Sequence, residues 1–453
     1  MPWGGPAPSH ARWLLAILGV AIVMMSTGAQ AETPPPEEPA QLRAEADLLF
    51  KRMLVRPDDL DAAFRFAEIE ARLGDYEAAI GALERMLFYN NNLPRVRLEL
   101  GLLYFRLGSY EMARSYFETA VAPNTPAEVR ARVATFLAEI DRRLAANQFA
   151  FFAQTGLRHQ TNADAGPDSD VIRVIGQDAT IASQFRRRPD WNGFVSASLH
   201  HAYDFGDQRG DVWESDVTAY YARQFKVEDL NLGLIEASTG PRFGLGQGVG
   251  LSLHPYVLGN GVSLADRPYF GTLGGGVSLR YDTGFGVTLE PDAEYRARGF
   301  SNSTPYPNAN DQDGDQAIVA LGASGALPVQ GLGWQGRLSY TDDAARYHPY
   351  AYEQFGIDLA LPYQFATPIT PGRTWTLAPF ASLLDVSYAT PDPIVDPNIK
   401  RHDQVYRVGG TLDTQLWQNF GFALTVEYDL THSTVINYRT KDFVVSGGPT
   451  VRF

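Results

Sequence analysis

Residues 420–433 read FGFALTVEYDLTHS, and their alternation decides the fold of the larger part of the chain. Apolar side chains take every second position: Phe420, Phe422, Leu424, Val426, Tyr428 and Leu430. The residues between them are small, polar or charged: Gly421, Ala423, Thr425, Glu427 and Asp429. A period of two places these sets on opposite faces of a β-strand. The stretch therefore predicts a strand with one oily face and one wet face.

The same period returns in many segments between Phe149 and Phe453, and it favours a membrane barrel over a soluble β-sandwich or propeller. The alternating runs are about 11–16 residues long, whereas soluble strands usually have about 5–6 and bilayer-crossing strands about 9–11. The polar face carries several charges per strand, which is typical of a wet lumen. We count 14 candidate strands, at 149–160, 191–205, 211–225, 229–244, 251–261, 269–283, 285–298, 316–327, 331–344, 352–366, 373–389, 402–417, 420–433 and 442–453.

The predicted connections support an up-and-down order. They should alternate between long loops on one side and tight turns on the other. The odd-numbered ones include three long segments, 161–190, 299–315 and 390–401. The even-numbered ones at 206–210, near Gly284, at 328–330 and at 418–419 are tight. Residues 226–228 break this rule by being short, and the Gly-rich 244–250 is interpreted as a flexible turn.

Residues 41–147 have a different period and predict a helical domain of tetratricopeptide (TPR) type. LGDYEAAI at Leu73 and LGSYEMAR at Leu107 lie 34 residues apart, which is the TPR period. Four residues have the structural roles of that repeat: Gly74 and Gly108 turn the chain, and Tyr76 and Tyr110 fill the gap beside the next helix. A half-repeat is expected at 42–54 and a capping helix at 125–147. A generic helical bundle is the alternative.

The first 40 residues contain no predicted domain. Residues 1–31 have the pattern of a secretory signal peptide, with an apolar run followed by Ala29-Gln30-Ala31; a membrane anchor is the alternative. Residues 32–40 are a Pro-rich linker. The fold class is therefore α + β in two regions, with a helical domain at 41–147 and a barrel at 149–453.

Few residues suggest chemistry, and we expect neither an enzyme nor a bound cofactor or metal. The chain has no cysteine, which excludes disulfides and thiolate metal sites. Its net charge of −14 argues against a nucleic-acid partner. His200 and His201 are neighbours on one strand and should point to opposite faces. Asp311, Asp313 and Asp315 could hold calcium, although a solvated acidic loop is the simpler interpretation.

The helical domain offers the best candidate binding surface. In the repeat register, nine residues line its concave face: Asp61, Phe64, Glu68, Arg72, Arg95, Leu98, Leu102, Phe105 and Arg106. Leu98, Leu102 and Phe105 form an apolar stripe at helical spacing. We weigh two interpretations of this stripe equally, a client-binding surface or packing against a neighbouring helix or the barrel.

A TPR domain followed by a 14-strand barrel resembles the surface lipoprotein assembly modulator (Slam) family. The resemblance spans the chain after the signal peptide, and TGLRHQTNADAGP at 155–167 is similar to the stretch that opens barrels of that family. It implies translocation of lipoproteins or other secreted clients to the cell surface, without catalytic residues. The TPR region is slightly shorter than in the better-known members, so the sequence does not identify the client protein.

This resemblance implies a location in the outer membrane of a Gram-negative bacterium, with the helical domain in the periplasm. Expected partners are the lipid bilayer, the barrel assembly machinery and a protein client. The assembly signal would be Phe443, Val445, Val451 and Phe453, in the final alternating strand. Ser446, Gly447, Gly448 and Pro449 interrupt that strand and should weaken its closure on the first one. A TPR-barrel exopolysaccharide exporter and a TPR-tethered porin or adhesin are the alternative functions.

Overall fold

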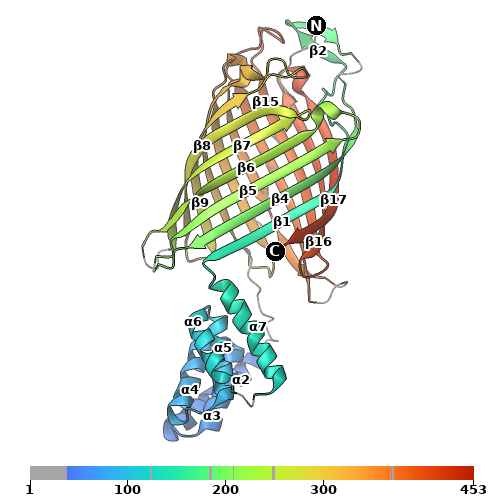
Figure 1. The fold of residues 1–453 in the computed structure, drawn as a ribbon. Helices are drawn as coiled ribbons and strands as arrows, with labels where there is room; N and C mark the ends of the chain where they lie inside the picture. The colour runs from blue at the N-terminus through green and yellow to red at the C-terminus, as the bar shows by residue number, and fades with distance from the viewer. Residues whose placement is uncertain are drawn as a thin grey trace. The chain divides into compact units, whose positions relative to one another are not determined.

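The chain forms a helical unit and a β-barrel, each compact in itself (Figure 1). The computed structural model describes residues 38–122, 125–182, 186–207, 209–246, 250–367, 369 and 372–453. The helical unit ends at Gln148, and the barrel unit begins at Phe149. The predicted signal peptide, the first six residues of the predicted linker and the centre of the 244–250 turn lie outside the described residues.

The helical unit has six helices in its described part: α2 (Glu38–Val55), α3 (Leu60–Leu73), α4 (Tyr76–Tyr89), α5 (Pro94–Arg106), α6 (Tyr110–Ala120) and α7 (Ala127–Arg143). Helix α2 begins inside the stretch predicted as a linker. The side chains of Asp59 and Asp75 accept hydrogen bonds from the backbone amides of Ala62 and Ala78, which caps α3 and α4. Two helical pairs, α3–α4 and α5–α6, confirm the predicted TPR-type repeats.

The repeat needs a small residue at position 101 because two helices approach closely there. Gly101 is buried in α5, and a methyl group added there would lie 2.8 Å from the Phe117 ring of α6. Phe117 is itself buried and stacks on Phe136 of α7 at 5.2 Å between ring centroids. Gly74 and Gly108 have φ values of 87° and 76°, in the left-handed region that favours glycine. The glycine pattern therefore sets both the close approach and the turns.

The barrel is a closed antiparallel sheet of 14 strands, which confirms the prediction. Its strands are β1 (Asn147–Gln160), β4 (Asp190–Asp204), β5 (Val212–Gln224), β6 (Leu232–Gly244), β7 (Leu251–Leu264), β8 (Arg267–Asp282), β9 (Val287–Phe300), β10 (Gly314–Ala326), β11 (Gly333–Asp343), β12 (Tyr352–Ala360) with β13 (Tyr363–Ala366), β14 (Thr374–Tyr388), β15 (His402–Gln415), β16 (Phe420–Ser433) and β17 (Thr440–Arg452). Each strand pairs with its chain neighbours, and β1 closes on β17 (Figure 1).

Three features differ from the predicted strands. The stretch 352–366 is one wall position broken into β12 and β13 by Leu361 and Pro362, because proline cannot donate to a ladder. The predicted loop 161–190 contains a hairpin of β2 (Val171–Val174) and β3 (Gln177–Thr180). Strands β7 and β8 continue further than predicted and meet in the two-residue turn Ala265–Asp266. Ala265 and Asp266 have φ values of 55° and 57°, which are unusual for residues other than glycine.

The two ends of the barrel differ, and we name them by their connections. The loop end carries the long segments 161–189, 301–313 and 389–401, together with the short 3-10 helices η3 (Glu228–Leu230), η4 (Ala309–Gln312), η5 (His348–Tyr350) and η6 (Ile436–Tyr438). The turn end carries 283–286, 327–332 and 416–419, and β1 begins and β17 ends there. The predicted alternation of long and short connections holds except at 225–231, 265–266 and 434–439, which are short connections at the loop end.

Candidate functional site

The outer surface of the barrel is apolar over most of its height. Val257, Leu273 and Val319 are 60%, 73% and 58% exposed, although all three are aliphatic. Other exposed aliphatic residues of this band are Leu157, Val195, Leu199, Val217, Ile235, Val277, Leu321, Leu338, Leu359, Leu377, Val408, Leu424 and Val426. A soluble protein rarely exposes so large a continuous apolar surface. This band is the surface that a barrel needs in contact with lipid chains.

Aromatic side chains border the apolar band at both ends. Exposed aromatic residues near the turn end are Phe149, Tyr203, Phe205, Trp213, Phe243, Tyr281, Phe285, Tyr363, Trp417, Phe420 and Phe453. Those nearer the loop end are Trp191, Tyr221, Phe225, Tyr295, Tyr340, Phe355, Tyr406, Tyr428 and Phe443. Aromatic girdles of this kind mark the two interfaces of a membrane-spanning barrel. Among the described residues, no helix is both long and apolar enough to cross a bilayer.

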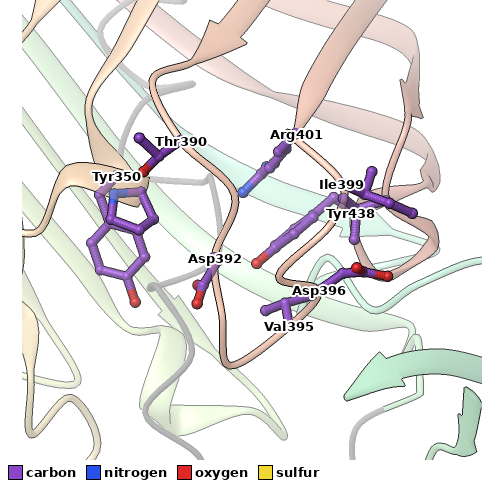
Figure 2. Close-up of a pocket in the computed structure, with 10 residues that line it drawn as sticks. Tyr350, Thr390, Asp392, Val395, Asp396, Ile399, Arg401 and Tyr438 are labelled. Carbon is purple, nitrogen blue, oxygen red and sulfur yellow. The ribbon is translucent and has the colours of Figure 1, made fainter. Parts of the chain in front are cut away.

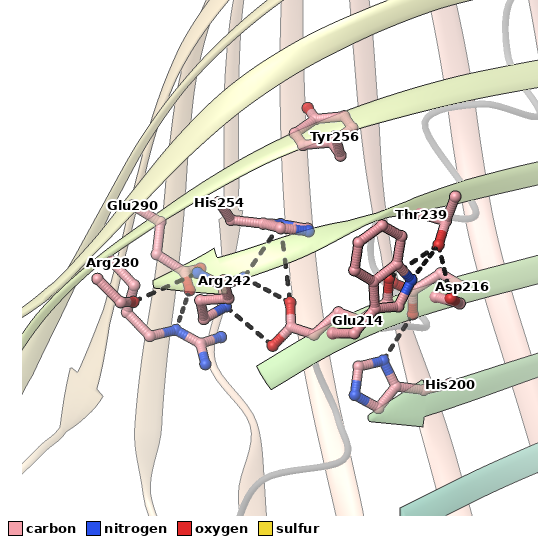
Figure 3. Close-up of polar contacts among 12 residues, drawn as sticks. His200, Glu214, Asp216, Thr239, Arg242, His254, Tyr256, Arg280 and Glu290 are labelled. Atoms are coloured by element: carbon pink, nitrogen blue, oxygen red, sulfur yellow. Dashed lines mark hydrogen bonds and ion pairs between the residues drawn. The ribbon is translucent and has the colours of Figure 1, made fainter. Parts of the chain in front are cut away.

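The inward side chains of β4 to β7 form a polar network on one wall of the lumen (Figure 3). Arg242 of β6 donates two hydrogen bonds of 2.8 Å to the carboxylate of Glu214 on β5. His254 of β7 lies 3.7 Å from the same carboxylate. His200 of β4 contacts Asp216 at 2.8 Å, whereas its neighbour His201 stacks on Phe149. The two histidines therefore point to opposite faces, as the alternation predicts.

This network continues along the same wall to β9. The Tyr256 hydroxyl lies 2.7 Å from both Asp292 and Glu294. Arg296 makes ion pairs with Glu294 at 2.6 Å and with Glu236 of β6 at 3.4 Å. Paired charges of both signs are compatible with a hydrated lumen. Chemically, this wall can bind polar and charged groups.

The wall formed by β1, β15, β16 and β17 has its own chain of charges. Arg158 of β1 lies 3.5 Å from Glu427 of β16, and Arg407 of β15 lies 3.9 Å from the same carboxylate. Arg407 also pairs with Asp429 at 3.0 Å. Arg452 and Asp413 pair at 2.6 Å nearer the turn end. The Arg158–Glu427 and Arg452–Asp413 pairs each reach across β17 or β16 to a strand that is not a direct neighbour, whereas Arg407 pairs with residues of the adjacent strand β16.

The stretch TGLRHQTNADAGP closes the junction of β1 and β17 at the loop end. Gln160, Thr161 and the Asn162 amide all donate hydrogen bonds to the Asp442 carboxylate of β17, at 3.3, 2.9 and 2.8 Å. The buried Asn162 side chain also exchanges two hydrogen bonds of 2.9 Å with the backbone of Gly166. The sequence pointed to this stretch but not to its partner Asp442, which is 280 residues from Asn162 along the chain.

The proposed assembly signal occupies the outward face of β17. Phe443 and Phe453 are exposed, and Val445 and Val451 are half-buried between them. The Phe453 backbone pairs with Phe151 of β1 through hydrogen bonds of 3.0 and 3.1 Å. These four residues therefore lie on the outer surface of the barrel, and their role as an assembly signal stays a prediction.

Three of the predicted client-binding residues come together on the helical unit. The Arg95 guanidinium lies 4.6 Å from the centre of the Phe64 ring and 3.8 Å from the Glu68 carboxylate. Arg106 lies further along α5, 5.8 Å from the Tyr76 ring. Asp61, Arg72, Arg95 and Arg106 are exposed, while Phe64 and Glu68 are half-buried. Phe64, Glu68 and Arg95 form a compact, partly exposed site, which we call the Arg95 site.

The predicted apolar stripe is covered by helix α7. Leu98, Leu102 and Phe105 are half-buried in a cluster that includes α7 residues, and Phe105 meets Phe136 edge-on at 5.4 Å. Tyr110 packs on the other side of Phe105, and Arg143 lies over both rings. The structure thus supports the packing interpretation for these three residues. Tyr110, which the repeat pattern predicts to fill the gap beside the next helix, contacts Phe105 of α5 and Arg143 of α7.

A shallow pocket opens among the loops at the loop end (Figure 2). Arg401 lies between the rings of Tyr388 and Tyr438, at 4.3 and 3.4 Å from their centres, and pairs with Asp403 at 2.6 Å. Burial raises the pKa of Tyr438 to about 12. Asp396, also in the lining, accepts hydrogen bonds from Asn398 and Arg173, and these hold its pKa below its usual value. Arg401 and Asp396, two charged residues of the lining, are therefore already engaged by other protein groups.

The acidic loop that could bind calcium is occupied by protein contacts. Asp313 accepts a 2.6 Å hydrogen bond from Phe300 and pairs with Arg346 at 2.7 Å. Asp311 lies in η4, and Asp315 lies on β10, paired with Ala297. In the part of the chain that the structure describes, no three His, Cys, Asp or Glu side chains are arranged to hold a metal ion.

Comparison with known proteins identifies the repeat and several structures of similar parts. A tetratricopeptide repeat family model matches residues 94–122, which include α5 and α6. No curated protein matches the chain. The type III secretion chaperone SycD of Yersinia enterocolitica, solved with a peptide of the translocator YopD, is similar with 14% identity, 30% of this chain and 96% of that chain covered, and a TM-score of 0.22.

Two porin-type structures are similar to the barrel. An anion-selective porin from Comamonas acidovorans has 8% identity, covers 68% of this chain and 99% of its own, and gives a TM-score of 0.35. The outer membrane channel DcaP of Acinetobacter baumannii has 10% identity, with 68% and 97% covered and a TM-score of 0.37.

Proposed function

We propose that this chain translocates protein clients across the outer membrane of a Gram-negative bacterium. The helical unit collects the client in the periplasm, and the barrel provides its passage. The observation that carries this proposal is the joining, in one chain, of TPR-type repeats with a 14-strand barrel whose exterior is apolar and whose interior is charged. TPR repeats are protein-binding scaffolds with an extended concave surface, so a client protein is the natural ligand of the helical unit.

The finer assignment is a protein of the surface lipoprotein assembly modulator type, delivering lipoproteins or other secreted clients to the cell surface. The supporting observation is the stretch 155–167, whose Asn162 and Thr161 tie the start of the first loop to the last strand. The mechanism would be non-enzymatic, driven by client binding and by folding outside. The barrel assembly machinery would insert the chain, with Phe443, Val445, Val451 and Phe453 as its signal.

One observation favours a second candidate, the export of an exopolysaccharide. The lumen wall places the Tyr256 ring beside the carboxylates of Asp292 and Glu294, and Phe194 faces Tyr220 at 6.3 Å. Aromatic faces with nearby carboxylates are the groups expected along a sugar conduit. In this barrel the Tyr256 hydroxyl is already hydrogen-bonded to those carboxylates.

The proposal is tested by deleting residues 41–146 and measuring two outputs, surface display of a co-expressed lipoprotein and polysaccharide in the medium. Loss of display alone supports the proposal, and loss of polysaccharide alone supports the second candidate. Unchanged display in a strain whose barrel is still inserted contradicts the proposal. Leakage of small solutes, measured in parallel, separates a simple tethered porin from both.

A charge exchange tests whether the Arg95 site binds the client. Arg95→Glu and Glu68→Lys each break the 3.8 Å ion pair, whereas the double variant restores a pair of opposite polarity. If the client binds through the positive charge of Arg95, its affinity for the double variant should stay about tenfold below its affinity for the wild-type chain. That factor corresponds to the loss of one charge-assisted contact of about 1.4 kcal/mol. Recovery of wild-type affinity in the double variant would show that the pair is only structural.

A further inference from the structure

The junction of β1 and β17 lacks one backbone hydrogen bond near the middle of its height. Paired residues of an antiparallel ladder exchange two hydrogen bonds at every second position. Phe151 and Phe453 form such a pair, and the same alternation reaches Thr161 and Phe443. Thr155 and Pro449 stand at one of the positions between them. Because proline has no N–H, the Thr155 carbonyl receives no backbone donor from β17.

The pairing register shows the same interruption. It runs from Phe152↔Arg452 to Gln154↔Thr450 and resumes at Leu157↔Gly447 without a change of phase. Between these points the backbones are crowded, since a methyl group on Gly448 would lie 1.8 Å from the Thr155 oxygen. A methyl group on Gly156 would lie 2.2 Å from the Gly447 oxygen. Only glycine fits both positions, and glycine weakens a strand.

Side chains from β1 reach over β17 to β16 at this height. The inward residues of β17 here are Ser446 and Gly448, which have little or no side chain. Arg158 of β1 therefore pairs with Glu427 of β16 at 3.5 Å, and the Gln154 amide donates to the Ala423 carbonyl at 3.5 Å. Arg158 and Glu427 are only 16% and 7% exposed. We call this ion pair the latch, because it connects β1 to the strand beyond its direct partner.

Both ends of the junction are held more firmly than its middle. At the turn end, Phe151 and Phe453 exchange two backbone hydrogen bonds. At the loop end, Asp442 accepts three hydrogen bonds from residues 160–162. The β2–β3 hairpin adds a strap there, since Arg173 exchanges two hydrogen bonds with Asn437 and pairs with Asp396 at 2.9 Å.

We propose that the β1–β17 junction parts sideways between its two fixed ends, with the Arg158–Glu427 latch controlling the opening. Strands lie about 4.8 Å apart, so a gap limited to the middle of one strand pair admits an extended segment or an acyl chain but no folded domain. Resting on the proposed function, the opening gives an apolar part of the client, such as a lipid anchor, a route from the charged lumen into the bilayer. Lipid is the favourable solvent for such a segment.

Opening is measured first without any client, by hydrogen exchange of the full chain in lipid nanodiscs. The backbone amides of Ala153, Thr155, Leu157 and His159, which face β17, should exchange at least about tenfold faster than the β4 amides that face β5, because the β4–β5 ladder is continuous from Asn192 to Asp204. Pro449→Val restores a donor and should slow this exchange, whereas Glu427→Gln breaks the latch and should speed it. The proposal would be overturned if amides at the β1–β17 and β4–β5 junctions exchanged at equal rates and neither variant changed the rate at β1–β17.

A second arm tests the link to delivery with cysteine pairs, since the native chain has no thiol. Gln154→Cys with Thr450→Cys locks the junction, and Ser198→Cys with Thr218→Cys provides the same cross-link between β4 and β5. Oxidation should reduce lipoprotein display at least about tenfold in the first variant only, and a reductant should restore it.

The outcomes of this arm separate the two proposals. Display that survives the lock but fails on deletion of residues 41–146 would overturn the sideways route and leave the translocation function intact. Display that survives both changes would overturn the function, and hydrogen exchange would then decide the opening by itself.

Discussion

Two glycines of the helical unit show that the value of a residue depends on what lies beside it. Gly81 lies exposed in α4 with nothing within 4 Å of the position of a methyl group, whereas Gly101 in α5 faces the Phe117 ring. The repeat pattern predicts a small residue at position 101, and the structure supplies the reason. It gives Gly81 no comparable packing role.

The two positions should respond in opposite directions to alanine. Gly81→Ala should raise the free energy of unfolding of the helical unit by about 1 kcal/mol, because alanine loses less backbone entropy. Gly101→Ala should lower it by about 1–3 kcal/mol, because the added methyl group overpacks the Phe117 ring. Urea unfolding followed by circular dichroism at 222 nm measures both. Equal shifts for the two variants would contradict this account of the repeat.

The cap of α3 predicts a dependence on pH. The Ala62 amide and the Arg52 guanidinium both donate to Asp59 and lower its pKa below the usual value of 3.8. A lowered folded-state pKa contributes stability above pH 3.8 that is lost as pH falls through the folded value. Asp59→Asn, which keeps an acceptor without the charge, should therefore reduce the melting temperature of the helical unit at pH 7 but much less at pH 2. A reduction that is the same at both values would contradict the charge argument.

At the scale of elements, the local sequence pattern predicts the strands well and the turns poorly. The wet and oily faces of β5, β9 and β16 follow directly from their residues. The turn Ala265–Asp266 has no Asn-Gly signal, so sequence reasoning ended β7 early. Contacts from a distant segment hold it, since Asn231 and Tyr221 donate to Asp266 at 2.8 and 3.1 Å. Partners far away in the chain compensate for an unfavourable backbone, and no local pattern reports them.

This turn gives a prediction at two adjacent positions. Ala265→Gly should stabilise the barrel by about 1 kcal/mol, because glycine removes the cost of the left-handed conformation. Asp266→Gly should give no gain, because it also removes the acceptor for Asn231 and Tyr221. The midpoint of urea unfolding in lipid vesicles measures both variants. A gain from Asp266→Gly as large as that from Ala265→Gly would show that the two hydrogen bonds contribute nothing.

The helices give a similar lesson about candidate sites. The spacing of Leu98, Leu102 and Phe105 identifies an apolar face but cannot say what covers it. Helix α7 does so through Phe136. For the Arg95 site, in contrast, the repeat register identifies Phe64 and Glu68 of α3 and Arg95 of α5 as candidates, and the structure adds the contacts between them.

At the scale of the whole molecule, the exterior of the barrel should tolerate only apolar substitutions, as a lipid-facing surface does, and the interior should tolerate polar and charged ones, as a hydrated surface does. Val426 and Thr425 are neighbours near the middle of β16, one facing outward and one inward. Val426→Arg should cost about 2–4 kcal/mol of folding free energy in bilayers, and Thr425→Arg should cost little. Folding into phosphatidylcholine vesicles, read from the heat-modifiable gel mobility, compares them. Equal tolerance of both variants would argue against a membrane-facing exterior.

The architecture as a whole was predictable from the sequence because both periods persist over many residues. The lumen networks were not, since Arg158, Glu427 and Arg407 come from three strands, and their contacts depend on the closure of the barrel. The interruption at Pro449 was visible in the sequence. Its position opposite Thr155, and the ties on either side of it, required the ladder itself.

The pairing of β1 with β17 also has a consequence for the time course of synthesis. Thr161 and Phe443, which meet in this ladder, are 282 residues apart. Contacts of such long range form slowly because a large loop must close first. Until β17 emerges and docks, β1 is an unpaired edge that can join another chain. We therefore expect the unpaired β1 to need protection from other chains during that interval, and slow translation over the later strands would lengthen the period of risk.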